Sequence, residues 1–223
     1  MKLLLKLFLL ALPLFPSLLH AEEVARINIH ATPATVERIT FNPKSPPKDM
    51  PPLKGNEAAE TQYNFGCEVK LKYEMRQNLS SDGKVDVVAT IKELTVTLKL
   101  HNRIFIPQNG NAKLRAHEEG HREINERVYK DAESVAREEA QRIVSKTWIA
   151  SSSTPDAAGK AATDQAVNQL CNSYMKRVAE KASRIGDIYD ELTDHGRSMQ
   201  VTVNEAIAKS IKRYDAEQRS VQH

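Results

Sequence analysis

The hydrophobic periodicity of the chain changes at Gly110, and this change limits the folds that the chain can adopt. Before Gly110, apolar residues alternate with polar ones, as in half-buried strands; after it, they recur every three or four residues, as in helices. The sequence therefore predicts an α+β fold, in which a small antiparallel β-sheet is followed by a long helical hairpin. We expect one domain over 22–223, mainly β over 22–108 and mainly α over 110–223.

The strands of the first half are bounded by prolines and by a glycine turn. Prolines between Asn42 and Thr61 exclude regular structure there. Asp82-Gly83 marks a turn, so the strands around it are expected to form an antiparallel meander. The expected strands are Val24–Ile29, Thr35–Phe41, Phe65–Met75, Val85–Ile91 and Leu94–Ile106.

Three helices are expected in the second half. The first is capped by Asn111 and runs to about Trp148. The second begins after Thr154, a favourable N-cap residue that precedes Pro155, and continues to Gly186 or beyond. A shorter third helix is expected near Val203–Tyr214.

The segment Met1–Ala21 has the composition of a signal peptide, 1–21. Lys2 and Lys6 accompany a leucine-rich run, Pro13 and Pro16 interrupt it, and Ala21 ends a plausible cleavage site. No later segment is long and apolar enough to span a bilayer, so we expect no stable membrane insertion after cleavage. The sequence thus predicts a periplasmic or secreted protein.

The charge of the chain excludes one class of partner. The formal net charge is +3, and removal of Lys2 and Lys6 with the signal segment leaves about +1. Acidic and basic residues alternate along the helices, whereas a nucleic-acid-binding face gathers basic ones. We therefore expect no nucleic acid as partner.

The chain has two cysteines, Cys67 and Cys171. An even count in an exported chain favours a disulfide between them, and separately buried thiols are the alternative.

The motif His117-Glu118-Glu119-Gly120-His121 lies in the first expected helix. Its i, i+4 spacing places both imidazoles on one face, where they can bind a single Zn²⁺ ion. Glu118 lies beside them and can act as general base toward a metal-activated water that attacks a peptide bond. This pattern predicts a zinc-dependent peptidase.

Two histidines leave a zinc ion short of a third protein ligand. The remaining helix positions do not extend the motif, because position 127 is Arg. His195 is the first candidate, and Asp190 is the second. For straight helices, His195 would overshoot His121 by roughly 14 Å at 1.5 Å per residue, so a bend at Gly186 is required to bring it over the metal. Without that bend, Asp187 or Asp190 becomes the better ligand. Asp194 is a candidate acceptor for an imidazole N–H.

The segment Tyr189-Asp190-x-x-Thr193-x-His195-Gly196 follows the HEEGH motif by about seventy residues. This pair of motifs resembles a bacterial family of secreted zinc-dependent proteases, classed as a domain of unknown function, over roughly Val24 to Gln200. The resemblance implies zinc bound by His117, His121 and His195, with Glu118 as the base, and a peptide or protein as substrate. A non-catalytic zinc-binding envelope or interaction protein is the alternative that the residues leave open.

Overall fold

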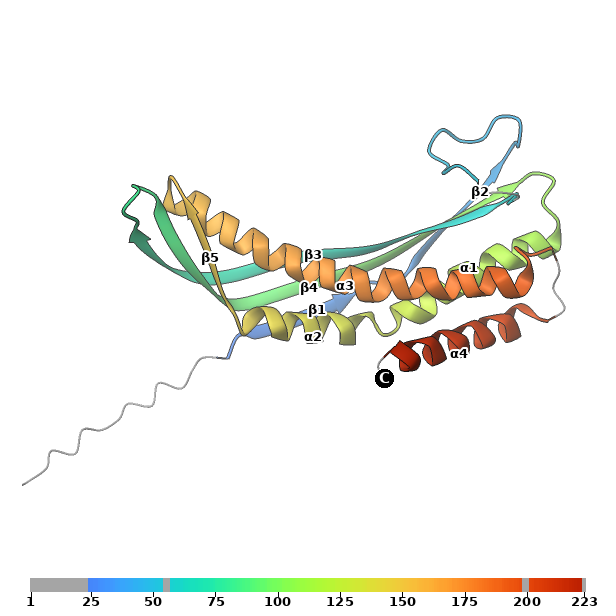
Figure 1. The fold of residues 1–223 in the computed structure, drawn as a ribbon. Coiled ribbons are helices and arrows are strands. Elements are labelled where there is room, and N and C mark those ends of the chain that lie inside the picture. The colour runs from blue at the N-terminus through green and yellow to red at the C-terminus, as the bar shows by residue number, and fades with distance from the viewer. Residues whose placement is uncertain (1–23, 54–56, 198–200, 222–223) are drawn as a thin grey trace, which may run out of the picture.

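The computed structural model describes residues 24–53, 57–197 and 201–221. The expected signal segment, Met1–Ala21, lies outside them. The described chain forms an elongated five-stranded sheet with four helices packed against it (Figure 1).

Strand β4 (Val85–Pro107) is the centre of the sheet, because the other four strands all pair with it. Strand β3 (Glu60–Leu79) runs antiparallel along one edge of β4, and the connecting turn uses Gly83 at a φ of 81°. Along the other edge, β5, β1 and β2 follow one another. Their bounds are Thr147–Ser152 for β5, Arg26–Ala31 for β1 and Thr35–Phe41 for β2.

The expected α+β class was wrong, because β1 and β2 both pair with β4 in parallel. The fold is α/β: a five-stranded sheet that contains these parallel pairs, together with four helices, and not a small antiparallel sheet followed by a helical hairpin. The physical reason is that the alternation of apolar residues identifies a strand but carries no information about its direction. A hairpin turn fixed the antiparallel β3–β4 pair, whereas β1 and β2 have no hairpin to β4.

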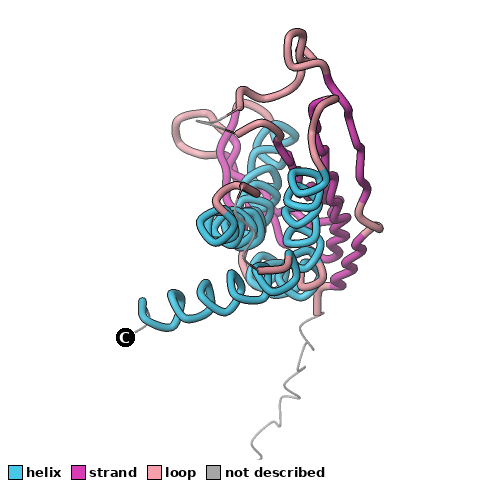
Figure 2. The backbone as a smooth tube through the Cα atoms, turned by 90° about the vertical axis from the view of Figure 1, so that its right-hand side faces the viewer, coloured by secondary structure: helices cyan, strands magenta, loops and turns pink. Residues whose placement is uncertain are grey.

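The helices lie together against the sheet (Figure 2). Helices α1 (Ala112–Tyr129) and α2 (Ala132–Val144) follow one another, α3 (Pro155–Thr193) runs beside β3 and β4, and α4 (Val203–Val221) packs on α3 and α1. Thr154 caps α3 as expected, accepting a hydrogen bond from the backbone N–H of Ala157.

Several boundaries differ from the sequence expectation. The two strands expected at Val85–Ile91 and Leu94–Ile106 form the single strand β4, and both β3 and α4 are longer than expected. The first helix ends at Tyr129 and a second begins at Ala132, although the buried row Ile124, Val128, Ala132 continues at helical spacing across the break. The end of that expected helix, near Trp148, instead lies in β5, where Trp148 is 8% exposed. Pairing with the start of β4 therefore overrode the local helical pattern.

The core lies between the helices and one face of β4. Alternate residues of β4 are fully buried, including Val87, Val96 and Leu98. On α3 the first turns that meet the sheet carry small side chains, which allow the helix backbone to approach closely. These buried residues are Ala158, Ala162 and Ala166.

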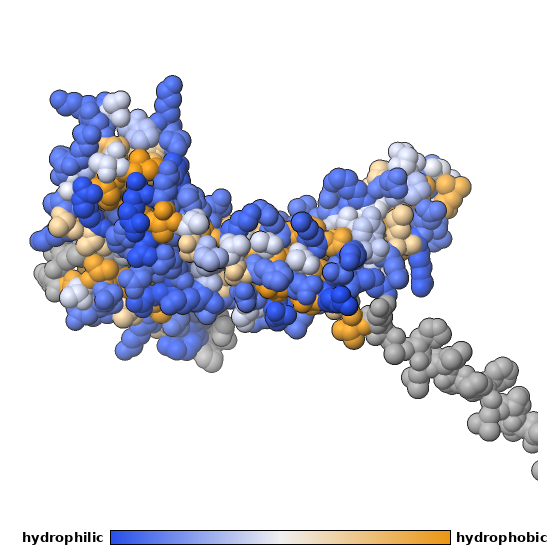
Figure 3. Space-filling model, turned by 180° about the vertical axis from the view of Figure 1, so that it is seen from behind, coloured by the Kyte–Doolittle hydropathy of each residue, from blue (hydrophilic) through white to orange (hydrophobic). Residues whose placement is uncertain are grey.

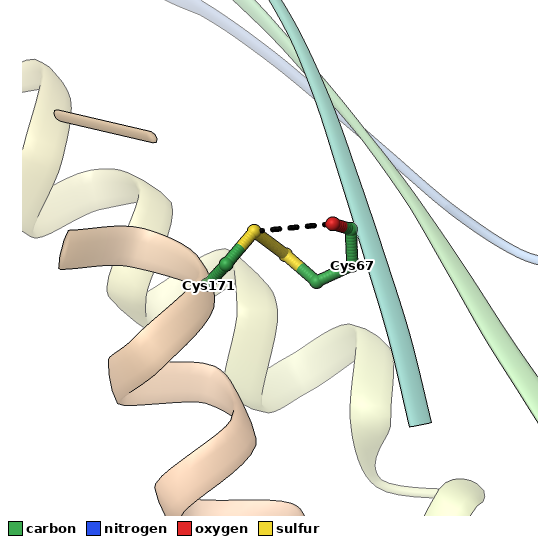
Figure 4. Close-up of a disulfide and its surroundings, with 2 residues drawn as sticks. All are labelled: Cys67 and Cys171. Atoms are coloured by element: carbon green, nitrogen blue, oxygen red, sulfur yellow. Dashed lines mark hydrogen bonds between the residues drawn. A yellow bond between two sulfur atoms is a disulfide. The ribbon is translucent and has the colours of Figure 1, made fainter. Parts of the chain in front are cut away.

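The disulfide predicted from the cysteine count is confirmed. Cys67 of β3 and Cys171 of α3 are joined, with a Cα–Cα distance of 5.7 Å (Figure 4). The crosslink spans 104 residues, and in the chain-entropy model a loop of this length contributes up to about 4–5 kcal/mol to stability. It also ties the middle of α3 to the sheet, which helps to fix where the C-terminal half of α3 lies.

Among the described residues, none of the helices has the length and apolar character needed to cross a bilayer. The surface seen from behind is mainly hydrophilic, with apolar residues in small groups (Figure 3).

Candidate metal centre

Helix α1 carries both histidines of the HEEGH motif at one end of the sheet (Figure 1). It is capped by Asn111, whose side-chain oxygen accepts a hydrogen bond of 2.9 Å from the backbone N–H of Leu114. The side chain of His117 is 3% exposed and that of His121 is 18% exposed. The helix therefore turns both imidazoles toward the protein interior.

Helix α3 is not interrupted at Gly186, because it continues as helix to Thr193. This continuous helix places Asp190 beside the two histidines of α1. The Asp190 Oδ1 atom lies 2.9 Å from His121 Nε2 and 3.2 Å from His117 Nε2, and the two Nε2 atoms are 3.3 Å apart. Asp190 thus lies where the third ligand was expected if the chain did not bend at Gly186.

These three side chains can hold a metal ion. Ligand atoms at 2.0–2.1 Å around a tetrahedral ion lie about 3.3 Å from one another, so the observed separations of 2.9, 3.2 and 3.3 Å are close to what an ion requires. Two imidazoles and a carboxylate also form a donor set typical of divalent transition metals.

His195 lies beside this group and does not replace Asp190 in it. Its Nδ1 atom is 3.8 Å from Asp190 Oδ1 and 3.5 Å from Glu57 Oε1. His195 follows the end of α3 with a left-handed φ of 51°, as does Asp194 with 48°. The prediction that His195 is a metal ligand stays a prediction; the structure brings it to the same pocket, next to Asp190.

Thr193 orients the imidazole of His117. Its hydroxyl donates a hydrogen bond of 2.8 Å to the carbonyl of Tyr189, so it can only accept from His117 Nδ1, which lies 3.3 Å away. A metal ion bound at Nε2 requires the proton of neutral His117 to be on Nδ1, where the Thr193 oxygen can accept it. Asp194, the acceptor expected from the sequence, instead pairs with Arg197.

Tyr189 packs across the motif helix. Its ring is stacked on His117, with centroids 5.0 Å apart, and its hydroxyl donates to the His117 carbonyl at 3.4 Å. A Cβ atom on Gly120 would lie 2.3 Å from the Tyr189 oxygen, so only glycine fits the fourth position of HEEGH. This close approach is a reason for that glycine that the motif alone did not give.

Two glycines of the centre give a matched prediction. Gly120→Ala should destabilise the protein by about 1–3 kcal/mol or more, because the new methyl group overlaps fully buried Tyr189. Gly186→Ala should be neutral or stabilising by about 0.5–1 kcal/mol, because its Cβ would meet His121 Nδ1 at an ordinary 3.5 Å within a continuous helix. Urea unfolding of both variants measures the difference. Equal free energies of unfolding would contradict this packing.

The carboxyl group of Glu118 lines the same pocket as His117, His121 and Asp190, and its pKa is raised. Thr61 lies near the start of β3, where that strand pairs with β4. Its hydroxyl donates a hydrogen bond of 2.7 Å to Glu118 Oε2. Burial raises the pKa of Glu118 to about 7, although the charge of His121 and the Thr61 hydrogen bond limit the rise. A carboxyl group with this pKa can accept and return a proton near neutral pH.

Burial and mutual contacts shift the pKa values of the three ligand side chains. Burial lowers the pKa of His117, which favours its neutral, metal-binding form. Burial would raise the pKa of Asp190, but hydrogen bonds from His117 and His121 outweigh it and hold that pKa well below its usual range. Burial opposes a charge on His121 as well, yet its hydrogen bond to Asp190 and the nearby carboxylates raise its pKa overall. Asp190 is thus an anion, as a metal ligand should be.

The metal-ligating group opens into a pocket of about 90 Å³. Glu118 of α1 and His195, which follows α3, line it on one side, and the segment that leads into β3 closes its other side. That segment contributes Glu57, Ala58, Ala59, Glu60 and Thr61. The prolines that precede this stretch predicted an irregular loop there, and no motif marks Thr61 or Glu57 as residues of the site.

Neither a protein-family model, nor a curated protein, nor a solved structure matches this chain. The resemblance to secreted zinc-dependent proteases therefore stays a prediction. The function has to be argued from the side chains of the centre.

Proposed function

We propose that this protein is a zinc-dependent peptidase that acts in the periplasm or outside the cell. The observation that carries the proposal is the position of Glu118, which lines the same pocket as His117, His121 and Asp190. A structural zinc site has four protein ligands, whereas a catalytic site has three and keeps a position open for water or substrate. Within the described residues, the ligand group consists of three side chains beside an acid–base residue.

The presence of Glu118 beside the ligand group favours zinc over other divalent metals as the ion of this site. The same donor set of two imidazoles and a carboxylate can hold iron, whose oxygenase chemistry has no need of a glutamate at the second position of the helix motif. Hydrolysis does need a base beside the ion.

A zinc ion bound by these residues would supply a Lewis acid that polarises the peptide carbonyl and lowers the pKa of water. The chain supplies the proton transfers. Glu118 accepts a proton from the attacking water and returns it to the leaving amine, and Thr61 holds the carboxyl group in position throughout. Thr193 keeps the His117 ring in the tautomer that exposes Nε2.

Export is supported by two features of the chain. Met1–Ala21 has the composition of a signal peptide, and the Cys67–Cys171 disulfide is of a kind that persists in oxidising compartments.

Metal-dependent hydrolysis by the mature chain, purified from Glu22 onward, tests the proposal. Peptide mixtures are incubated with the protein as purified, after dialysis against a strong zinc chelator, and after addition of one equivalent of Zn²⁺. We expect cleavage that disappears with the metal and returns with it, because Glu118 alone cannot activate water sufficiently. Cleavage that persists in metal-free protein would contradict the proposal, as would a zinc-loaded protein that cleaves no peptide.

A further inference from the structure

A second, larger cavity adjoins the metal pocket and shares two of its residues. Glu57 and Ala58 line both. The second cavity has a volume of about 540 Å³, within the range of about 300–1,000 Å³ that is usual for ligand sites. Its other walls are mainly apolar side chains, among them Phe41, Pro46, Met50, Leu53 and Pro107.

The walls of this cavity are held in place before any ligand binds. The loop after β2 contains prolines 43, 46, 47, 51 and 52, whose φ angles are fixed. The backbone N–H groups of Ser45 and Met50 are bonded within the loop, and Asp49 forms an ion pair of 2.6 Å with Arg103 of β4. The floor is equally fixed, because Phe41 ends β2 and is 5% exposed. A preformed site loses little entropy when a ligand enters.

The two cavities differ in size and chemistry in a way that suits an extended peptide. The metal pocket, about 90 Å³ in volume and lined by carboxylates and imidazoles, has room for a peptide group but not for a large apolar side chain. The neighbouring cavity has the size and the apolar walls for such a side chain. A peptide that places its scissile bond beside Glu118 can therefore place a nearby side chain across Glu57 and Ala58.

We infer that the cavity between the proline-rich loop 42–53 and the ends of β2 and β4 is the specificity pocket, and that it selects substrates with a large apolar side chain, such as Leu or Phe, near the scissile bond. This inference rests on the proposed peptidase function. It adds the class of substrate, which the metal-ligating residues do not determine.

Hydrolysis of matched peptides tests the inference. The substrates are end-blocked nonapeptides of Gly and Ser that carry either Leu or Ser at the central position. We expect kcat/KM for the Leu peptide to exceed that for the Ser peptide by at least about 10-fold, since contacts of this kind discriminate by roughly 10–200-fold. Cleavage should occur at one fixed distance from the Leu.

The variant Leu53→Asp places a charge on the wall of the cavity, where Leu53 is 37% exposed, so the fold should tolerate it. We expect the ratio of kcat/KM for the Leu and Ser peptides to fall to about 3 or less, with zinc content and melting temperature unchanged. Leu79→Asp is the control, because Leu79 is 79% exposed at the far end of β3, and its ratio should equal that of the unsubstituted protein. Equal ratios for all three proteins would overturn the inference, although hydrolysis itself would still support the peptidase function.

If neither peptide is cleaved, that result counts against the peptidase function and leaves the specificity pocket to be tested by binding. The zinc-loaded Glu118→Gln protein is titrated with each nonapeptide in a calorimeter. At least about 10-fold tighter binding of the Leu peptide, lost with Leu53→Asp, supports the specificity pocket. Equal affinities, or no binding of either peptide, would overturn it.

Discussion

Replacement of Glu118 by Gln should lower kcat/KM for peptide hydrolysis by about 10²–10⁴-fold while zinc remains bound in full. The amide cannot accept the proton of water, whereas its carbonyl oxygen can still accept the hydrogen bond of Thr61, which is 2.7 Å long in the native protein. The fold and the metal ligands should therefore be undisturbed. Steady-state kinetics and metal analysis on the same preparation measure both effects.

The neighbouring residue provides a control with the same chemical change. Glu119 lies on the outer side of the helix, where it pairs with Arg38 and Arg122. Glu119→Gln loses surface ion pairs worth about 0–1 kcal/mol and should leave kcat/KM within about twofold. A Glu118→Gln protein as active as Glu119→Gln would remove Glu118 from the mechanism.

Replacement of Asp190 by Ala should weaken zinc binding by more than the roughly 10–100-fold that follows loss of a residue outside the coordination shell. It removes the carboxylate oxygen that lies 2.9 and 3.2 Å from the two Nε2 atoms. Competition with a chromophoric chelator measures the affinity. Activity should fall with the metal content.

Two control variants show whether the loss of zinc is specific to Asp190 or follows from removing any charged or polar side chain nearby. Asp187 is exposed on α3, one turn before Asp190, so Asp187→Ala should keep the zinc affinity of the unsubstituted protein. His195→Ala should weaken binding less than Asp190→Ala, because His195 Nδ1 lies 3.8 Å from Asp190 Oδ1 and outside the group of ligand atoms. If His195→Ala loses zinc and Asp190→Ala retains it, then His195 and not Asp190 is the third ligand.

The sequence was sufficient for features that depend on local spacing. The i, i+4 interval of His117 and His121 predicted that both imidazoles lie on one face of the helix, and their Nε2 atoms are 3.3 Å apart. Thr154 and Pro155 predicted the start of α3, and the even cysteine count predicted the disulfide. Each of these follows from a rule that acts within one element or from simple counting.

Features that depend on how elements meet were beyond the sequence. The direction of β1 and β2 relative to β4 does not alter their alternation of apolar residues, so a parallel pair and an antiparallel pair look alike. The third member of the metal group depended on whether α3 bends at Gly186, and one glycine in a long helix does not decide that. Thr61 reaches Glu118 only because β3 begins beside α1.

X-ray absorption spectroscopy at the zinc edge, combined with metal analysis of the mature protein, tests the central claim most directly. The account predicts one zinc ion per chain, bound by two imidazoles from His117 and His121, with the remaining ligands being oxygen atoms of Asp190 and water or substrate. A protein that binds no zinc would contradict it. A shell closed by four protein ligands, with a third imidazole among them, would also contradict it and would make the site structural.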